Sequence, residues 1–332
     1  MPDPTVAERL AAAIAAVHDI PPAVRTACAN LVLDIAGLCA AVRATDYIAS
    51  VVSGVDGSGS CTAIGHRQGF DPSSAMLING TAAHGEDFDD TFEGGPVHSG
   101  AAIVPAVLAA AERHGLDGGG VVRGVAVGCE TMCRLSLVVP RAVHKSGFHP
   151  TAVFGAIGAA AGVSAALGLP AGQIVAALGT AGSMASGIIE YLAEGTWTKR
   201  LHPGWAAQSG YRAAMLARAG FVAPRTVFEG RHGLFNGFAR TTDGDWNALL
   251  GDFGRRWVTP TIAIKPYACG TMTHPYIDCA RRLKQRGVKP EQAIEILCKT
   301  SEGYVHRLWE PLADKQTPRN GYAAKFSVPY AV

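Results

Sequence analysis

The sequence contains few charged and few aromatic residues. Of its 332 residues, 17% are charged and 7% are aromatic, the formal net charge is +2, and lysines and arginines form no long block. Such a composition provides no electrostatic attraction for nucleic acid or for an acidic membrane surface. A chain of this length can bury a large core. We therefore expect a neutral globular enzyme with a small-molecule substrate and with no nucleic-acid or membrane partner.

The sequence also lacks the common metal and redox motifs. Its eight cysteines form no CxxC pair, and no two histidines are spaced as HxxxH. The first 17 residues are amphipathic and carry Asp3 and Glu8, so they lack the basic region and the long apolar run of a secretory signal. We interpret the cysteines as reduced core thiols of a cytoplasmic protein.

Helical periodicity dominates the first 220 residues, where strands do not alternate with helices. This absence argues against a parallel α/β sheet. The glycine-rich residues 51–69 predict an irregular connection with a short extended piece. Apolar spacing and flanking Pro or Gly residues predict helices over 10–17, 24–42, 73–83, 101–114, 121–138, 151–167, 171–183 and 208–219.

Residues 152–169 contain no charge and are close to the minimum length of a membrane span. The stretch consists mostly of Ala and Gly, however, so its insertion into a bilayer would be weakly favoured at best. Gly155, Gly158 and Gly162 lie at helix-spaced positions that permit close approach of another helix. We therefore expect a fully buried central helix rather than a membrane span.

The sequence pattern changes after residue 259. Residues 261–266 and 293–299 resemble short strands, and residues 274–286 between them predict a helix. The last stretch, 326–332, is apolar and strand-like. The fold class that we predict is mostly α, with a large all-helical domain over 1–260 and a smaller α+β lid domain over 261–332. The apolar terminus leads us to expect that the lid domain is incomplete at its C-terminus.

The densest group of polar side chains lies in residues 84–99, between two apolar helix-like segments. These sixteen residues include five acids, two histidines and a threonine. Buried charge is costly unless it is paired, binds a metal or takes part in chemistry. Three interpretations follow: helix caps paired with arginines, a Mg²⁺ site formed by Asp87, Asp90 and Glu93, or acid/base chemistry with His84 and His98.

Three further segments bounded by Gly or Pro carry basic or imidazole groups. They are GFHPT at 147–151, GTWTKRLHPG at 195–204, which we interpret as a loop, and KPYACGTMTH at 265–274. His149 directly precedes a predicted helix N-terminus, where backbone N–H groups favour anions. Such segments suit a small polycarboxylate, because cations such as Lys199 and Lys265 can clamp its carboxylates while a histidine or lysine moves a proton.

With these motifs the sequence resembles the MmgE/PrpD family, which includes 2-methylcitrate dehydratase, cis-aconitate decarboxylase and related isomerases. The resemblance spans nearly the whole chain, and the combination of motifs is more specific than any one of them. The segments that carry it are DIP at 19–21, NGTA at 79–82 leading to His84, DFDDT at 87–91, GFHPT at 147–151, TKRLHPG at 198–204, KPY at 265–267 and FS at 326–327.

The resemblance implies a mostly helical domain with a smaller α+β lid, assembled as a homodimer without metal or organic cofactor. It places the active site between the two domains, and it implies that such chains normally continue past Val332. The positions that match the family's site are Asp87, Thr91, His98, His149, Lys199 and Lys265, with Tyr304 as a weaker match in the lid.

Two positions depart from the dehydratase branch of the family. That branch usually has DFNDT and HPS, whereas here Asp89 stands in DFDDT and Gly100 follows His98-Ser99. The second acid is closer to the decarboxylase and isomerase branches. His98, however, lacks the proline that usually follows it there.

We hypothesise a cofactor-independent lyase or isomerase that dehydrates or decarboxylates a citrate- or aconitate-like acid by proton transfer next to a carboxylate. Asp87 would orient His98, and Lys199, Lys265 and His202 would hold carboxylates. An iminodisuccinate-type epimerase, a Mg²⁺-dependent enzyme and a non-catalytic carboxylate-binding protein are the alternatives. The predicted site residues are His98, His149, Asp87 and Lys199 as catalytic groups and Thr91, His84, His202, Lys265 and Tyr304 as substrate-binding groups.

Overall fold

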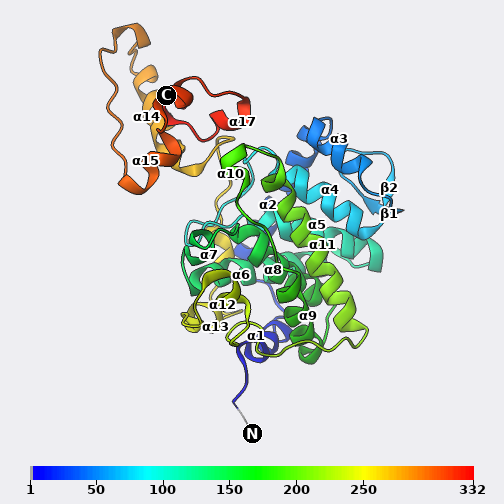
Figure 1. Cartoon of the computed structure of the whole chain (residues 1–332). Coiled ribbons are helices and arrows are strands. Elements are labelled where there is room, and N and C mark those ends of the chain that lie inside the picture. Colours follow the sequence, from blue (N-terminus) through cyan, green and yellow to red (C-terminus); the bar gives the residue numbers. More distant parts are fainter. Residues whose placement is uncertain (1–2) are drawn as a thin grey trace. The chain divides into compact units, whose positions relative to one another are not determined.

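The computed structural model describes residues 3–332, most of which are helical (Figure 1). The chain divides into two compact units. The helical unit comprises the chain up to Gly85 together with Asp89–Ile264, and the C-terminal unit comprises Glu86–Phe88 together with Lys265–Val332. The predicted mostly α fold class is confirmed. No sequence pattern marks Glu86–Phe88 as a segment that leaves the helical unit.

The helical unit contains nearly all of the helices predicted from periodicity. The helix predicted at 151–167 is α8, Pro150–Ala166, and the helix predicted at 208–219 begins earlier, at Thr198. The other helices of this unit are α1 Val6–Ala15, α2 Pro22–Val42, α3 Asp46–Ser53, α4 Pro72–His84, α5 Ser99–His114, α6 Gly118–Val138, α7 Ala142–Lys145, α9 Ala171–Met184, α10 Tyr191–Glu194, α11 Thr198–Arg218, α12 Leu234–Ala239 and α13 Trp246–Leu250.

The helix α8 forms the centre of the helical unit. All of its residues up to Ala165 are buried, and α5, α6, α9 and α11 pack around it. Its glycines make this possible, since a Cβ on Gly162 would lie 2.7 Å from the carbonyl oxygen of Gly124 on α6. The expectation of a fully buried central helix is therefore confirmed.

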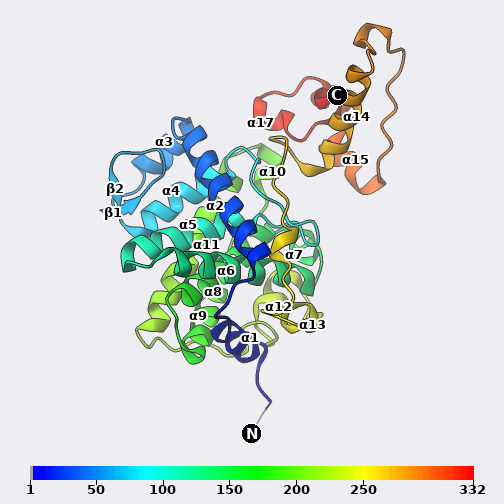
Figure 2. The ribbon, with the colours of Figure 1, turned by 180° about the vertical axis from the view of Figure 1, so that it is seen from behind.

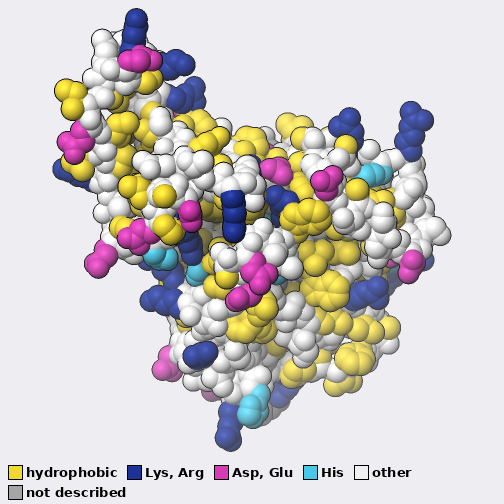
Figure 3. Space-filling view, turned by 45° about the horizontal axis from the view of Figure 1, so that its top comes forward, with side chains coloured by type: hydrophobic (Ala, Val, Ile, Leu, Met, Phe, Trp, Pro, Cys, Tyr) yellow, Lys and Arg dark blue, Asp and Glu magenta, His cyan; other side chains and the backbone are white. Residues whose placement is uncertain are grey.

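The helix α2 lies on the surface of the helical unit (Figure 2). Its inner face buries Leu31, Ile35 and Leu38, whereas Leu33 on its outer face is 73% exposed. Among residues 3–332 it is the one helix with the length and composition to cross a membrane, but one such helix is a weak indication because soluble proteins contain similar ones. Figure 3 shows further hydrophobic side chains at the surface.

A close crossing of α4 and α11 positions two histidines of the candidate site, His84 and His202. A Cβ on Gly80 would lie 2.4 Å from the Cα of Gly204, so the two backbones meet where neither residue can carry a side chain. His84 ends α4 four residues after Gly80, and His202 precedes Gly204 by two residues. Helix packing therefore sets the separation of these two histidines.

The extended piece predicted within residues 51–69 is present. The strand β1 (Ser58–Thr62) pairs with β2 (Gly69–Phe70) in an antiparallel two-stranded sheet, with an irregularity between Ser58 and Cys61. The side-chain amide of Asn79 on α4 binds this region, because its Oδ1 accepts from the N–H of Ile64 and its Nδ2 donates to the carbonyl of Thr62. The sheet is thereby attached to the helix that ends at His84.

A buried ion pair attaches the segment before the C-terminal unit to α6. Glu130 accepts a hydrogen bond from Nε of Arg134 at 2.6 Å and others from the main-chain N–H groups of Val258 and Thr259. The Arg134 guanidinium donates to the carbonyl oxygens of Ala248, Gly251 and Arg256. We call this group the Glu130–Arg134 clamp.

The C-terminal unit is described by itself as a set of short helices. The helix predicted at 274–286 is confirmed as α14, His274–Gln285. The other helical elements of this unit are the 3-10 turns η2 Thr271–Thr273 and η3 Pro290–Gln292 and the helices α15 Glu302–Leu308, α16 Leu312–Gln316, α17 Gly321–Ala324 and α18 Val328–Ala331.

The strands predicted after residue 259 are wrong. In 261–266 only Ala263 forms a bridge, with Thr91, and residues 326–332 contain α18 instead of a strand. Residues 293–299 lie in no strand, and Ile294 and Ile296 are exposed. Alternating apolar residues predict a strand only if a neighbour pairs with its N–H and C=O groups, and the described chain provides none here.

Candidate active site

Four histidines from four helix ends lie together in the helical unit. His84 ends α4, His98 directly precedes α5, His149 directly precedes α8, and His202 lies near the start of α11. The ring centroids are 4.8 Å apart for His84 and His98, 5.6 Å for His84 and His149, and 5.2 Å for His149 and His202. We call these four residues the histidine cluster.

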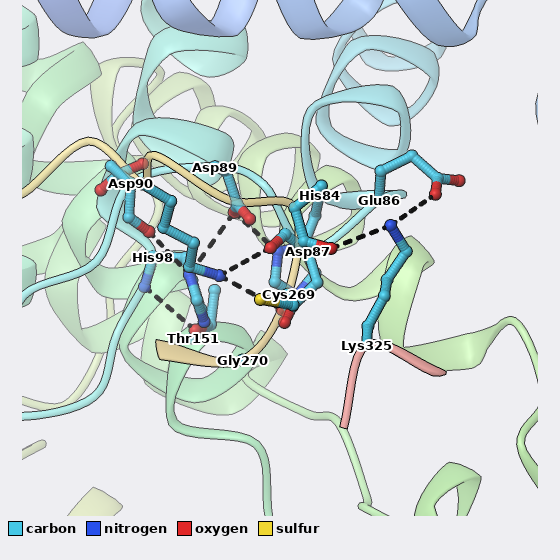
Figure 4. Close-up of polar contacts among 12 residues, drawn as sticks. His84, Glu86, Asp87, Asp89, Asp90, His98, Thr151, Cys269, Gly270 and Lys325 are labelled. Carbon is cyan, nitrogen blue, oxygen red and sulfur yellow. Dashed lines mark hydrogen bonds and ion pairs between the residues drawn. The ribbon is translucent and has the colours of Figure 1, made fainter. Parts of the chain in front are cut away.

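The starts of α5 and α8 are tied to each other, which brings His98 and His149 close. The main-chain N–H of His98 donates to Oγ1 of Thr151 at 3.2 Å, one residue into α8 from Pro150 (Figure 4). The carboxylate of Asp90 accepts from the N–H groups of Ser99 and Gly100 and so caps the N-terminus of α5.

The loop before α8 pairs with the chain that leads into α10. The N–H of His149 donates to the carbonyl of Gly187 at 2.8 Å, and Ile189 donates to the carbonyl of Gly147. Gly187 has φ +110, and a Cβ there would lie 2.4 Å from the Cβ of Ala152, so this position requires glycine. The pairing places the Tyr191 ring 6.0 Å from that of His149.

Asp89 is the carboxylate beside two of the cluster's rings. Its Oδ2 lies 2.7 Å from Nδ1 of His84 and 3.6 Å from Nδ1 of His98 (Figure 4). Nδ1 of His98 also lies 2.7 Å from the carbonyl oxygen of Asp90. The sequence-based hypothesis gave Asp87 the role of orienting His98, but the carboxylate that the structure places beside His98 within the helical unit is that of Asp89.

These hydrogen bonds determine which ring nitrogen carries the proton. A carbonyl oxygen accepts hydrogen bonds and cannot donate them, and the same holds for an ionised carboxylate. Nδ1 of His98 faces the carbonyl of Asp90 and Nδ1 of His84 faces the carboxylate of Asp89, so Nδ1 is the protonated atom of both rings. In the neutral rings, Nε2 then holds the lone pair. Nε2 of His84 is buried and has no hydrogen-bond partner among the described residues. Among the described residues, the cluster therefore contains a basic nitrogen atom, Nε2 of His84, that local structure does not satisfy.

Burial keeps His149 and His202 uncharged. Burial lowers the pKa of His149 well below its usual value, and the nearby His84, His202, Lys199 and His98 lower it further. Burial, His84 and Lys199 lower the pKa of His202 to about 4. At neutral pH a histidine with this pKa is uncharged, so His202 offers a hydrogen bond rather than a positive charge to a carboxylate.

Lys199 is the buried lysine of this site. It lies in the first turn of α11 and is 7% exposed. The predicted loop over 195–204 is wrong from Thr198 onward, because tight packing of α11 on α4 at Gly204 favours helix where the local Pro and Gly predict a turn. Arg200, next in the helix, stacks on the ring of Tyr47 at 4.2 Å.

Three predicted site residues belong to the C-terminal unit. Nζ of Lys265 donates to the carbonyl of Asp87 at 2.9 Å and lies 3.5 Å from its Oδ1, with both side chains buried. Lys265, which we predicted to hold a substrate carboxylate, therefore also contacts a carboxylate of the protein itself, that of Asp87. Tyr304 lies in α15 and is 36% exposed.

The segment Glu86–Phe88 is held within the C-terminal unit by a second lysine. Nζ of Lys325 lies 3.1 Å from Oε2 of Glu86 and also donates to the carbonyl of Ala268 (Figure 4). Asp87 adopts φ +53, which a residue with a side chain rarely adopts. His84 and Asp89 flank this segment in the sequence, so the two residues are joined by a stretch whose contacts belong to the other unit.

The acids proposed as a Mg²⁺ site do not form a common group. Asp90 caps α5, and burial, with a contribution from the neighbouring Asp89, raises its pKa to about 7, while hydrogen bonds from Gly100 and Ser99 oppose the shift. Glu93 is exposed. In residues 3–332, the trio with ligand-like spacing is His84, Asp89 and His98, whose ligand atoms lie within 4.8 Å of one another, a spacing that a metal ion could also use.

Some members of the cluster's surroundings are not evident in the sequence. Asp89 and Thr151 lie inside motifs that mark the site, so their involvement could be suspected. Tyr191, whose ring lies 5.7 Å from that of His202, stands in an ordinary apolar stretch and carries no sequence signal of a site.

Thr91, a predicted site residue, is placed by main-chain hydrogen bonds with Ala263 at 2.8 and 2.9 Å.

Comparison with known proteins identifies relatives of this chain. The family model of the MmgE/PrpD N-terminal domain matches residues 8–247. The chain is 30% identical over 283 residues to the cis-aconitate decarboxylase-like protein oryM of Aspergillus oryzae, which covers 80% of this chain and 58% of the relative.

Two further relatives are similar to this chain. Cis-aconitate decarboxylase of Aspergillus terreus is 30% identical over 288 residues, covering 82% of this chain and 58% of the relative. Cis-aconitate decarboxylase of Mus musculus is 31% identical over 233 residues, covering 67% of this chain and 46% of the relative. The chain thus spans about half the length of the curated relatives that it matches.

Proposed function

Because the chain belongs to the MmgE/PrpD family, we propose that it is a lyase that removes CO₂ from an aconitate-like tricarboxylic acid. The observation that carries this proposal is the histidine cluster, with Asp89 beside His84 and His98 and with Lys199 near enough to lower the pKa of His149. The relatives named above are cis-aconitate decarboxylases or similar to them, which supports decarboxylation of such an acid.

The helical unit offers positive charge where an anionic substrate would need it. Lys199 is a buried cation, and the N-termini of α5 and α8 begin directly after His98 and His149. Helix N-termini carry unpaired N–H groups and a partial positive charge that favour carboxylates. We assign substrate carboxylates to Lys199 and the start of α8, because Asp90 already occupies the start of α5.

Decarboxylation of a carboxylate consumes one proton in each turnover, whereas dehydration and epimerisation consume none. When CO₂ leaves a carboxylate, the electron pair of the broken C–C bond stays on carbon, is delocalised into the neighbouring unsaturated acid, and must take up a proton. Within the cluster, Asp89 accepts a hydrogen bond from Nδ1 of His84 at 2.7 Å and so fixes the orientation of that ring. We assign His149, which directly precedes α8, as the proton donor. Positioned acid/base groups of this kind contribute about 10²–10⁴-fold to rate.

Asp89 also favours decarboxylation over dehydration within the family. The dehydratase branch usually has an asparagine in this position, and a side-chain amide can donate a hydrogen bond as well as accept one. Here the carboxylate lies near Nδ1 of both His84 and His98. The replacement of amide by carboxylate therefore fixes Nδ1 as the hydrogen-bond donor of these rings, because a carboxylate accepts hydrogen bonds and does not donate them.

We also propose that the protein forms a homodimer. The outer face of α2 is exposed, apolar at Leu33 and made of small residues at Ala29, Gly37 and Ala41, a surface that suits close packing of a second helix. In sedimentation analysis we expect wild type to sediment as a dimer and Leu33→Glu to shift the population toward monomer. A wild-type monomer would contradict the proposal.

Turnover of candidate acids tests the proposed function. The full chain is incubated separately with cis-aconitate, citrate, 2-methylcitrate and iminodisuccinate and followed by NMR. We expect release of CO₂ and loss of the cis-aconitate alkene proton signal. Elimination of water from citrate or 2-methylcitrate, or epimerisation of iminodisuccinate, would each replace decarboxylation by another reaction.

Two controls separate catalysis from binding. His149→Gln removes the imidazole near Lys199, whereas His232→Gln changes an exposed histidine outside the cluster. Only the first variant is expected to lose turnover. A rise in melting temperature with these acids, in the absence of any turnover, would indicate a carboxylate-binding protein instead.

A further inference from the structure

The histidines 149 and 202 form a direct ring-to-ring hydrogen bond. Their Nδ1 atoms are 3.0 Å apart, and both residues are buried. Two protons between these atoms would repel each other, and none would leave two lone pairs facing each other, so the contact requires one shared proton. The ring of Tyr191 lies 6.0 Å from that of His149 and 5.7 Å from that of His202. The contact between the two Nδ1 atoms is the hydrogen bond that joins the imidazoles.

The surroundings of this pair disfavour an additional positive charge. His84 on α4, His98 before α5 and Lys199 on α11 face His149. The carboxylate in this group, Asp89, contacts His84 and His98. His149 is therefore neutral at neutral pH, as is His202.

A neutral histidine cannot donate its proton without help. Loss of the Nε2 proton from neutral imidazole would leave an imidazolate, a stronger base than the other side chains of the site. The loss becomes feasible if Nδ1 of the same ring receives a proton in the same step. Nδ1 of His202 is the atom within reach of Nδ1 of His149.

We propose that His202 is a positioning residue that relays a proton to His149. His149 gives its Nε2 proton to the carbon that has lost CO₂, the shared proton moves from Nδ1 of His202 to Nδ1 of His149, and Nε2 of His202 takes up a proton from solvent. Both rings begin and end neutral, and one proton enters for each CO₂ released. Exchange with solvent after product release restores the starting tautomers.

The burial of the two rings gives the relay its direction. His149 is 5% exposed and His202 is 9% exposed, so His202 is the member nearer to solvent. The relay rests on the proposed function, because decarboxylation of a carboxylate consumes a proton in every turnover. Dehydration and epimerisation consume none.

Buffer rescue of a His202 variant tests the relay. In His202→Asn the side-chain amide can still bond to Nδ1 of His149 but cannot pass a proton onward. We expect kcat to fall about 10²-fold with little change in KM, and to recover with increasing concentration of imidazole buffer, to which wild type does not respond. Full kcat in His202→Asn, or a loss that imidazole does not change at wild-type melting temperature, would overturn the relay.

Nitrogen NMR of the wild-type protein tests the shared proton without substrate. With ¹⁵N-labelled histidine at neutral pH, we expect one protonated and one unprotonated Nδ1 in the pair, and His202→Gln supplies the assignment if His202→Asn does not fold. Two unprotonated Nδ1 atoms, or a charged pair, would overturn the proposal. A protein that shows the shared proton but decarboxylates none of the acids contradicts the proposed function, not the shared proton.

Discussion

The Glu130–Arg134 clamp and the histidine cluster are both buried and polar, but they differ in how completely their atoms are paired. In the clamp, both carboxylate oxygens of Glu130 accept hydrogen bonds, and the Arg134 guanidinium donates to three carbonyl oxygens. In the cluster, Nε2 of His84 is unpaired among the described residues, and the pKa of His149 is well below its usual value.

This difference separates a structural role from a chemical one. A buried charge whose partners are all internal contributes to a fixed arrangement of the chain. A buried polar atom without a partner costs stability and persists where an external ligand completes the arrangement. The clamp anchors residues 248–259 to α6, whereas the cluster leaves Nε2 of His84 for a substrate.

The largest effect that we expect is on turnover when the cluster loses a ring. His149→Gln should lower kcat by about 10²–10⁴-fold, because no other group takes its place as proton donor. Its melting temperature should stay near that of wild type. His149 is uncharged at neutral pH because its pKa is strongly lowered, so the variant removes no buried charge. Equal losses of turnover and of stability would make the cluster structural, like the clamp.

Breaking the clamp should act on stability instead. Glu130→Ala leaves the Arg134 charge buried without its carboxylate and should lower the free energy of unfolding by about 3–5 kcal/mol, measured by urea titration. The matched control is Arg225→Gln, which removes an ion pair of the same 2.6 Å length between Arg225, 61% exposed, and Glu8. Screening by solvent should limit its cost to less than about 1 kcal/mol. Similar costs for both variants would contradict the importance of burial.

The pH dependence of stability should show the cluster's neutral histidines. The pKa of His202 is lowered to about 4 from an ordinary value of 6.5, so between these pH values the unfolded chain binds a proton that the folded chain does not. Stability is therefore lost as pH falls from 6.5 to 4. His202→Gln should lose on the order of 2–3 kcal/mol less than wild type over this window, measured by urea titration at each pH.

Asp90 acts in the opposite direction and makes the paired measurement necessary. Its pKa is raised to about 7, so the folded chain binds the extra proton between about 4 and 7 and stability falls as pH rises there. Because Asp90 is present in both proteins, its contribution cancels in the difference. Identical slopes for wild type and His202→Gln would contradict the neutral state of His202 in the folded protein.

We expect no effect from removal of metal, which makes this the smallest of the predicted effects. Treatment with EDTA should change neither turnover nor melting temperature, and the purified protein should contain no stoichiometric metal by mass spectrometry. The ligand-like spacing of His84, Asp89 and His98 makes this measurement informative, because the clamp offers no comparable spacing. Turnover that EDTA abolishes and Zn²⁺ or Mg²⁺ restores would reassign the trio as a metal site.

Much of the fold could be predicted from local sequence. The apolar periodicity of α2, α5, α6 and α8 survives in the structure because burial of an amphipathic or fully apolar stretch favours the same helix that the pattern predicts. The errors occur where the local signal conflicts with packing. Pro203 and Gly204 predict a turn, yet Gly204 packs directly on Leu77 of α4 and the helix α11 continues through both.

The strand pattern at 293–299 failed for a related reason. Its alternation is clear in the sequence, but a strand requires a partner whose position no local pattern determines. The described chain provides no partner, and Ile294 and Ile296 remain exposed. Helices, in contrast, satisfy their own backbone hydrogen bonds and can be predicted without knowledge of a neighbour.

The sequence by itself determined the family, the mostly α class and the motifs that carry His84, His98, His149 and Lys199, because these depend on residue type and spacing along the chain. Only the tertiary structure decided that Asp89 is the carboxylate beside His84, that His202 is buried, and that the Nδ1 atoms of His149 and His202 lie 3.0 Å apart. Each of these depends on distances of about 3 Å and on exclusion of water, which residues far apart in the sequence create only when their helices pack together.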